Sequence, residues 1–376
     1  MAGVYIHIPF CRKACHYCNF HFSTSMQLQE GFVNALLQEI NLQKNYLSEP
    51  VSTIYFGGGT PSVLASANIC NIVSRLQKTF IVENNAEITL EANPDDITAE
   101  KLAEWKQIGI NRLSIGIQSF AEEDLVWMNR AHNAQQAFNC IASSKKAGFN
   151  NLTIDLIYGT PTLSDEAWEK NVKTAIELQI SHLSCYALTV EPKTALEKLI
   201  KQKTLADVDT EKQARHFELL MQWMQEAGYE HYEISNFAKP GFRSKHNSSY
   251  WQGKPYVGLG PSAHSFNGSS RQWNVANNAL YIQSISKGLV PFEAEVLTSN
   301  QQLNEYIMTS LRTMEGISLQ KVKQQFGEDR YEYVIKSARP HLNHHHLTVE
   351  NNHLKTTTKG KLLADGIAAD LFLLNH

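Results

Sequence analysis

The sequence has few cysteines, no long hydrophobic run and no excess of one charge sign. Three of its six cysteines lie within eight residues of one another, which is not the spread of thiols that a disulfide framework needs. No apolar run approaches ~18 residues, and no charged-then-apolar signal region is found. The 34 basic and 37 acidic residues give no general attraction to nucleic acid or anionic lipid. We therefore expect a cytoplasmic globular protein with reduced thiols.

Short β-branched runs alternate with amphipathic segments over the first 238 residues. Strands are expected at 3–8, 53–56, 87–91, 111–117, 151–157 and 182–188. This alternation predicts an α/β fold with parallel strands joined by helical crossovers, either a doubly wound sheet or a complete or partial TIM-like barrel. Polar residues end three of the strands, namely Glu91, Gln118 and Asp155. Barrels place their chemistry at these ends, so the pattern favours a barrel.

The pattern changes after residue 238. Residues 239–297 are rich in Gly, Asn and aromatic residues and are expected to form a loop-rich extension. Residues 298–376 contain two helical patterns and a polar hairpin-like segment with Asn351 and Asn352 at its turn. We therefore expect a barrel over 1–238, the extension, and a small C-terminal winged-helix-like domain.

Three cysteines, Cys11, Cys15 and Cys18, directly follow the first expected strand in "YIHIPFCRKACHYCNF". Thiolates with this spacing on a short loop suit a 4Fe-4S cluster and leave one iron without a protein ligand. The alternative is a structural zinc site, which needs four ligands that usually arrive as two separated pairs. A histidine at position 7, 16 or 21 would have to supply the fourth ligand, so the cluster is favoured.

Other blocks of the sequence accompany the cysteine loop: "FGGGTPS", "EANP", "GIQSF", "DLIYGTP" and "HNSSYW". Together they resemble the radical S-adenosylmethionine (SAM) superfamily and, within it, the oxygen-independent coproporphyrinogen III dehydrogenase family and its heme chaperone branch, HemW. The resemblance covers nearly the whole chain. It implies a partial (β/α)6 TIM-like barrel that holds a 4Fe-4S cluster, with SAM on the open iron.

The resemblance also implies which residues bind the cofactors, and it assigns no catalytic residue. The cluster is expected on the three cysteines, and the SAM pocket is expected to include Tyr5, Tyr17, Gly58, Gly59, Thr60, Glu91, Gln118, Arg130 and Asp155. The glycines would let backbone groups approach the ligand closely, although a tight turn capped by Thr60 or Ser62 is an alternative. Buried polar residues at strand ends need partners. Arg130 either pairs with a carboxylate or is an exposed surface residue.

The "HNSSYW" block begins at His246 and matches a motif associated with the heme chaperone branch. A histidine can ligate heme iron, and the adjacent Tyr250 and Trp251 can pack against a flat macrocycle. The alternative is a loop anchored by these aromatic residues, with His246 hydrogen-bonded internally. The triplet at 344–346 is expected to be a solvated loop, and Cys70, Cys140 and Cys185 to be small buried residues.

Two features separate the branches. In the dehydrogenase branch a further cysteine typically follows the third by two positions, but here Asn19 and Phe20 follow Cys18. That branch also has an N-terminal extension, whereas ten residues precede Cys11. We therefore expect a heme chaperone that passes heme to apo-hemoproteins such as respiratory enzymes, rather than a coproporphyrinogen III dehydrogenase; whether the chain is an enzyme is left open.

The expected partners follow from this interpretation. They are heme and apo-hemoprotein recipients, with no nucleic acid. The final domain is a candidate surface for a recipient or for peripheral membrane contact. The residues leave the oligomeric state open, a homodimer included.

Overall fold

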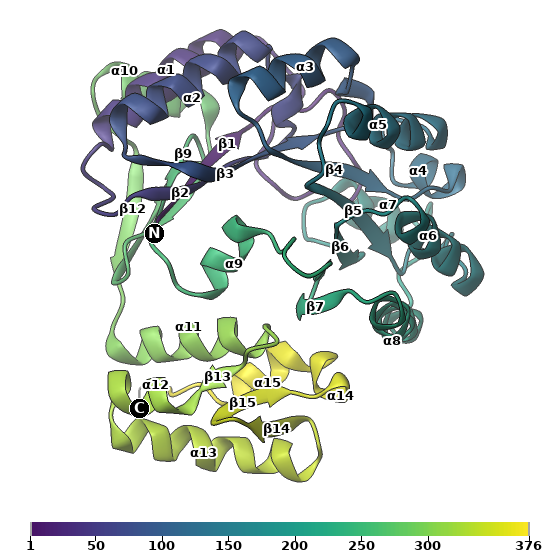
Figure 1. The fold of residues 1–376 in the computed structure, drawn as a ribbon, viewed down its shortest axis with the longest axis vertical. Helices are drawn as coiled ribbons and strands as arrows, with labels where there is room; N and C mark the ends of the chain where they lie inside the picture. Colours follow the sequence, from purple (N-terminus) through teal and green to yellow (C-terminus); the bar gives the residue numbers. More distant parts are fainter. Residues whose placement is uncertain (1, 375–376) are drawn as a thin grey trace.

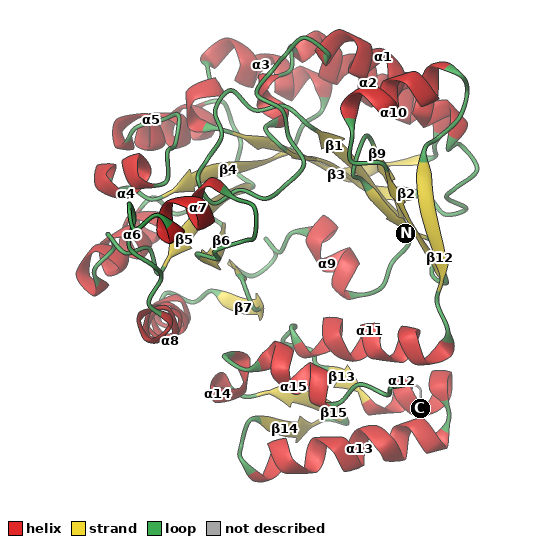
Figure 2. Cartoon of the chain, turned by 180° about the vertical axis from the view of Figure 1, so that it is seen from behind, coloured by secondary structure: helices red, strands yellow, loops and turns green. Residues whose placement is uncertain are grey.

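A twelve-stranded sheet dominates the computed structural model, which describes residues 2–374 (Figure 1). The strand order is β12-β11-β10-β9-β1-β2-β3-β4-β5-β6-β8-β7. The sheet curves into an open barrel with its main helices on the outer side, and a small C-terminal domain lies beside the opening (Figure 2). The predicted fold class, a partial barrel with a C-terminal domain, is confirmed.

The parallel half of the sheet alternates with helices as predicted. The strands are β1 (Ala2–Ile8), β2 (Val51–Gly58), β3 (Val82–Ala92), β4 (Arg112–Gln118), β5 (Leu152–Tyr158) and β6 (His182–Ala187). The connecting helices are α1 (Gln29–Leu42), α2 (Ser66–Thr79), α3 (Ala99–Ile108), α4 (Glu122–Trp127), α5 (Ala134–Lys146) and α6 (Asp165–Glu177). Every expected strand forms, because parallel strands covered by helices keep a nearly continuous apolar face.

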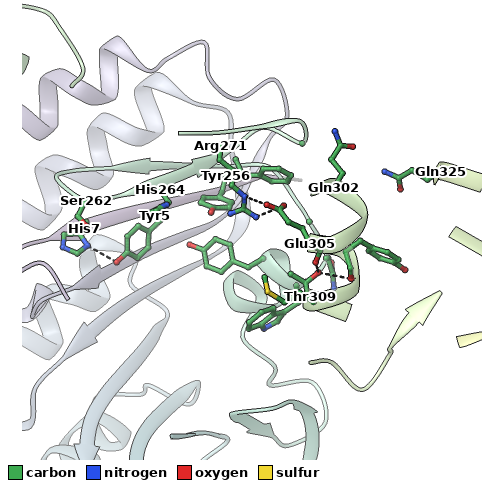
Figure 3. Close-up of a pocket in the computed structure, with 18 of the residues that line it drawn as sticks. Tyr5, His7, Tyr256, Ser262, His264, Arg271, Gln302, Glu305, Thr309 and Gln325 are labelled. Carbon is green, nitrogen blue, oxygen red and sulfur yellow. Dashed lines mark hydrogen bonds and ion pairs between the residues drawn. The ribbon is translucent and has the colours of Figure 1, made fainter. Parts of the chain in front are cut away.

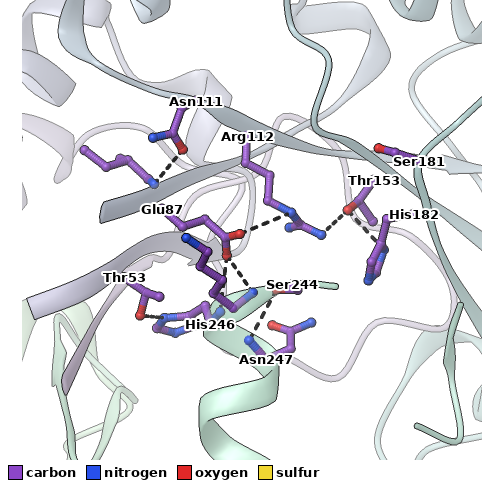
Figure 4. A network of polar contacts seen from close by, with 12 residues as sticks. Thr53, Glu87, Asn111, Arg112, Thr153, Ser181, His182, Ser244, His246 and Asn247 are labelled. Carbon is purple, nitrogen blue, oxygen red and sulfur yellow. Dashed lines mark hydrogen bonds and ion pairs between the residues drawn. The ribbon is translucent and has the colours of Figure 1, made fainter. Parts of the chain in front are cut away.

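Side chains alternate between the two faces of these strands with a period of two. Ile54, Leu113 and Ile154 belong to the large hydrophobic core of the domain. Their neighbours on the opposite face are polar. The inner polar residues, drawn in Figure 4, are Thr53, Glu87, Arg112, Thr153 and His182. The barrel is thus lined by buried polar groups that must find partners inside it.

Residues 239–297 are not the loop-rich extension that the sequence predicted. They contain α9 (Lys245–Trp251), β9 (Tyr256–Leu259), β10 (His264–Phe266), β11 (Ser270–Asn274), α10 (Asn278–Ser286) and β12 (Phe292–Val296). Strand β9 pairs in parallel with β1, and the next three strands continue the sheet antiparallel. Strands β9, β10 and β11 have no period of two, so the local pattern did not reveal them; β12, with the sequence FEAEV, does alternate and was missed.

After β6, the chain forms α7 (Ala195–Lys201) and α8 (Thr210–Glu226) before closing the other edge of the sheet with β7 (Glu230–Glu233) and β8 (Asn236–Ala238). Cys140 and Cys185 are buried as expected, but Cys70 is exposed on α2. The helical face of Cys70 points away from the apolar stripe of Ile69, Ile72 and Val73. Among the described residues, no helix combines the length and hydropathy of a membrane span.

The C-terminal domain has its own hydrophobic core, which includes Leu303, Ile307 and Leu354. Its elements are α11 (Ser299–Leu311), β13 (Ile317–Ser318), α12 (Leu319–Phe326), α13 (Glu328–Asn343), β14 (Leu347–Glu350), β15 (His353–Thr356), α14 (Thr358–Lys361) and α15 (Ala364–Asp370). The three strands form a separate sheet in the order β13-β15-β14. Asn351 and Asn352 have positive φ angles in the turn between β14 and β15, as the hairpin pattern predicted.

Candidate cofactor site

The cysteine loop follows β1 and is closed by backbone hydrogen bonds. The N–H of Cys11 donates to the carbonyl of Ser23 at 3.0 Å, and the N–H of Ser23 donates to Pro9 at 2.9 Å. Cys11 is buried, whereas Cys15 and Cys18 are partly exposed. The loop therefore holds its first thiol inside the barrel mouth and presents the other two toward solvent.

The glycine block at the end of β2 lets the cysteine loop approach closely. A Cβ on Gly59 would lie 2.8 Å from the carbonyl oxygen of Phe10 and 2.9 Å from that of Ile8. In the structure, the N–H of Thr60 donates to Phe10 at 2.8 Å, and its hydroxyl donates to Cys11 Sγ at 3.3 Å. The glycines thus allow the backbone after β2 to contact the backbone at the end of β1 closely, and they also line a cavity.

A cavity of about 440 Å³ opens beside this loop, and we call it the cluster-loop cavity. Its walls include most of the residues predicted for the cofactors, namely Cys11, Cys15, Tyr17, Cys18, Gly58, Gly59, Thr60, Glu91, Gln118, Arg130 and Asp155. The strand ends meet here because neighbouring parallel strands finish at the same edge. The sequence analysis did not single out Asn93, Ser114 or Tyr186, which also line the cavity. Asn93 lies in the quoted "EANP" block, so a signal for it was present.

Arg130 is not an exposed surface residue, which was the alternative in the sequence analysis. Its Nη2 donates to Asn93 Oδ1 and to the carbonyl of Gly116, each at 2.8 Å, and its Nη1 donates to Cys15 Sγ at 3.2 Å. A Cβ on Gly116 would lie 3.2 Å from Nη2, so the glycine makes room for the guanidinium. Among the described residues, no group pairs with its buried Nε. The guanidinium therefore places a positive charge in the wall of the cavity.

Two half-buried carboxyl groups line the same cavity. Burial, and next to it the charge of nearby Asp155, raise the pKa of Glu91 to about 8, although the Tyr55 hydroxyl donates to Glu91 at 2.7 Å. Burial also raises the pKa of Asp155 to about 6. Gln118 ends β4 with φ at 67°, a strained value for a residue with a side chain, and such strain clusters at functional sites. These residues therefore line the cavity with polar groups.

The donor set of the cysteine loop fits an iron–sulfur cluster. Within residues 2–374, no three His, Cys, Asp or Glu side chains converge closely enough to hold a single metal ion. In a cluster, different irons take the different thiolates, so the sulfurs need not meet at one point. Burial raises the pKa of Cys11 to about 11 and also raises the pKa of Cys18. Coordination would offset this effect, because a metal-bound thiol is deprotonated.

A second cavity, of about 750 Å³, lies between the barrel and the C-terminal domain, and we call it the interdomain cavity (Figure 3). Its walls come from β1, α9, β9–β11, α11 and α12, and they include Tyr5, which the sequence analysis expected in the SAM pocket. Tyr5 lies on the inner face of β1, where its hydroxyl is 3.2 Å from His7 Nδ1. Asn19 and Phe20 line both cavities. No single sequence block marked this cavity, because its walls come from distant segments.

His246 lies beneath the interdomain cavity and is only 1% exposed. Its Nδ1 is 2.8 Å from Thr53 Oγ1, and its Nε2 is 2.8 Å from the Tyr250 hydroxyl. Burial, followed by the charge of Arg112, lowers the pKa of His246 to about 3. Both ring nitrogens therefore have hydrogen-bond partners within the protein. This geometry matches the alternative in which His246 is hydrogen-bonded internally, rather than a heme ligand.

Glu87 anchors the helix that carries His246 (Figure 4). Its Oε1 accepts the backbone N–H of Lys245 at 3.0 Å and that of His246 at 3.2 Å. Ser244 caps the same helix by accepting from the N–H of Asn247. The polar floor of the barrel thus fixes where α9 begins.

Comparisons with known proteins agree with this architecture. Residues 5–175 match the radical SAM superfamily, and residues 297–363 match the HemN C-terminal domain. The chain is 36% identical to "Heme chaperone HemW" of Bacillus subtilis (strain 168), over 87% of each chain. It is 33% identical to the protein of the same name from Mycobacterium tuberculosis, over 98% of this chain and 94% of that one. Coproporphyrinogen III oxidase (HemN) from Escherichia coli superposes with a TM-score of 0.86 and 25% identity, over 99% of this chain and 90% of that chain.

Proposed function

The chain belongs to the HemW family of the radical SAM superfamily, and on this premise we propose that it is a heme chaperone. It binds heme together with a SAM-ligated 4Fe-4S cluster and passes the heme to apo-hemoproteins such as respiratory enzymes. The proposal rests on one observation: two cavities lie side by side, and Asn19 and Phe20 of the cysteine loop line both of them. One cavity has three thiols for a cluster, and the other is large and rich in aromatic side chains.

The chain offers a place for each part of the SAM-ligated cluster. Cys11, Cys15 and Cys18 would hold the 4Fe-4S cluster. When bound, the cluster and SAM supply one-electron chemistry. Arg130, in the wall of the cavity, would bind the carboxylate of SAM. Protonated Glu91 would donate to a ligand oxygen or accept from a hydroxyl, because its pKa of about 8 keeps the proton near neutral pH.

The interdomain cavity supports uptake and release of a large flat ligand. Its volume of about 750 Å³ falls within the ~300–1,000 Å³ of typical small-molecule sites. It is bounded on one side by a separate domain with its own core. Interfaces between domains permit relative motion more readily than a single core does. A ligand held there can leave without unfolding of the barrel.

The second candidate function is oxidative decarboxylation of coproporphyrinogen III. The fold similarity to the Escherichia coli oxidase along nearly the whole chain favours it. Against it stands the residue pair after Cys18. Phe20 occupies the position at which the dehydrogenase branch typically carries a further cysteine.

The decisive experiment measures both activities on one preparation. The protein is purified anaerobically with its cluster and SAM, then titrated with hemin, mixed with apomyoglobin as a heme acceptor, and separately incubated with coproporphyrinogen III. We expect stoichiometric heme uptake, transfer to the acceptor, and no protoporphyrinogen. Decarboxylation at many turnovers, or failure to bind hemin, would reject the chaperone function.

A further inference from the structure

The interdomain cavity contains three histidines, and among the described residues only His264 has no hydrogen bond at either ring nitrogen. His7 Nε2 lies 2.9 Å from the carbonyl of His21, and its Nδ1 meets Tyr5. His21 Nε2 lies 2.7 Å from Asn278 Oδ1. His264, by contrast, forms no side-chain hydrogen bond with any residue in the described range 2–374, and its side chain is exposed to the cavity. It is therefore the wall histidine whose two ring nitrogens could each bind an iron atom without losing a hydrogen bond.

The backbone of His264 is held firmly in place. It begins β10 and pairs with Trp273 of β11, whose ring centroid lies 6.2 Å from the imidazole. On its other side lies Gly258, where a Cβ would be 2.0 Å from the carbonyl oxygen of His264. Burial, followed by the charge of Arg271, lowers the pKa of the His264 ring. The ring is thus neutral near pH 7, the form in which imidazole ligates metals.

The walls around His264 suit a flat apolar ring. They include aromatic side chains from three parts of the chain, namely Phe20 of the cysteine loop, Tyr250, Trp251, Tyr256 and Phe266 of the barrel, and Tyr306 and Phe326 of the C-terminal domain. Tyr250 and Tyr256 meet edge to face with centroids 4.6 Å apart. Aromatic faces supply large contact areas to a planar ligand. Met308, 40% exposed, adds a thioether to the same walls.

Charge at the edge of the cavity suits a ligand that carries carboxylates. Lys321 lies with its Nζ 4.2 Å from the centroid of the Tyr306 ring and has no carboxylate partner among residues 2–374. Arg271 is already paired with Glu305 through two contacts of 2.8 Å. Lys321 therefore offers an unused cationic donor at this edge.

We propose that heme binds in the interdomain cavity with His264 as an axial ligand and Lys321 paired with a propionate. This proposal rests on the proposed heme chaperone function and adds the site and the ligand. His246 is then a positioning residue, because its Nε2 holds the Tyr250 hydroxyl at 2.8 Å and so orients one wall of the cavity. The "HNSSYW" helix contributes aromatic surface, and β10 contributes the iron ligand.

The experiment titrates hemin into the full chain with its cluster and follows the Soret band and the EPR spectrum. The variants are His264→Ala, His246→Ala, Lys321→Ala and, as a matched control, His344→Ala in an exposed loop of the C-terminal domain. Each variant is first checked for folding by circular dichroism and for iron content. Exogenous imidazole is then added to each heme complex.

We expect His264→Ala to shift the Soret band and to weaken binding at least about tenfold, equal to ~1.4 kcal/mol. Imidazole should restore the original spectrum of this variant. His246→Ala and Lys321→Ala should weaken binding without moving the band, and His344→Ala should match the unmodified chain. If the spectrum of His264→Ala is unchanged, or if imidazole restores only His246→Ala, His264 is not the axial ligand. The proposal that the chain binds heme would not be affected by that result. If the unmodified chain binds no hemin, the proposed function itself fails.

Discussion

Glu87 should control both the stability of the barrel and the position of the helix that carries Tyr250 and Trp251. Its buried carboxylate accepts two backbone N–H groups at the start of α9, and it lies 4.0 Å from the Nε of Arg112, which is 1% exposed. Replacing Glu87 by Ala removes both acceptors and leaves a buried guanidinium with less compensating charge. Glu87→Gln keeps one acceptor oxygen but loses the charge.

The magnitude follows from these contacts. Hydrogen bonds to a charged group contribute ~1.5–3 kcal/mol each, so two of them contribute about 3–6 kcal/mol. Removing one partner of a buried ion pair costs ~3–5 kcal/mol. The two effects share one carboxylate and do not add, so we expect Glu87→Ala to lower the free energy of unfolding by ~3–5 kcal/mol. Glu87→Gln should lower it by about 1–3 kcal/mol, because only the charge assistance is lost.

The assay combines urea unfolding with hydrogen exchange. Unfolding gives the free energy difference, and exchange at the amides of Lys245 and His246 reports on the two bonds directly. Glu83→Ala, on the same strand but without a hydrogen bond to a described residue, is the matched control and should change stability by less than ~0.5 kcal/mol. If Glu87→Ala left stability within ~1 kcal/mol and both amides equally protected, the carboxylate would not be anchoring α9.

Three further predictions test other parts of the site. Gly59→Ala should separate the cysteine loop from β2, because the new Cβ would lie 2.8 Å from a backbone oxygen; loss of iron content after reconstitution checks this. Arg130→Met should weaken SAM binding by about 2–4 kcal/mol, or ~30- to 1,000-fold by calorimetry; because Arg130 also donates to Cys15 Sγ, affinity is compared per reconstituted cluster. Burial raises the pKa of Glu39 from 4.5 to about 7, so the folded chain keeps a proton that the unfolded chain loses. This group should therefore lower stability by ~1.4 kcal/mol per pH unit between these values, and Glu39→Gln should reduce the measured slope of urea unfolding between pH 5 and pH 7 by about that amount.

Local patterns in the sequence were sufficient for the parallel strands and for the cluster-loop cavity. Strands such as β2 and β5 have continuous apolar faces and lie between helical segments, so their positions were visible from periodicity. The placement of Glu91, Gln118 and Asp155 in one cavity wall was predictable because parallel strands end at one edge. The cysteine spacing is likewise a local property.

The tertiary structure alone decided which histidine is free. His246 lies in the more recognisable motif, but its ring nitrogens are taken by Thr53 of β2 and by Tyr250 of its own helix. His264 stands in a short strand whose place beside β9 depends on the free edge of β1. Sequence spacing specifies neighbours along one element, whereas the partner of a buried polar atom depends on which elements pack together. For that reason the sequence located the cysteine loop, and only the packed barrel showed the cavity on its other side.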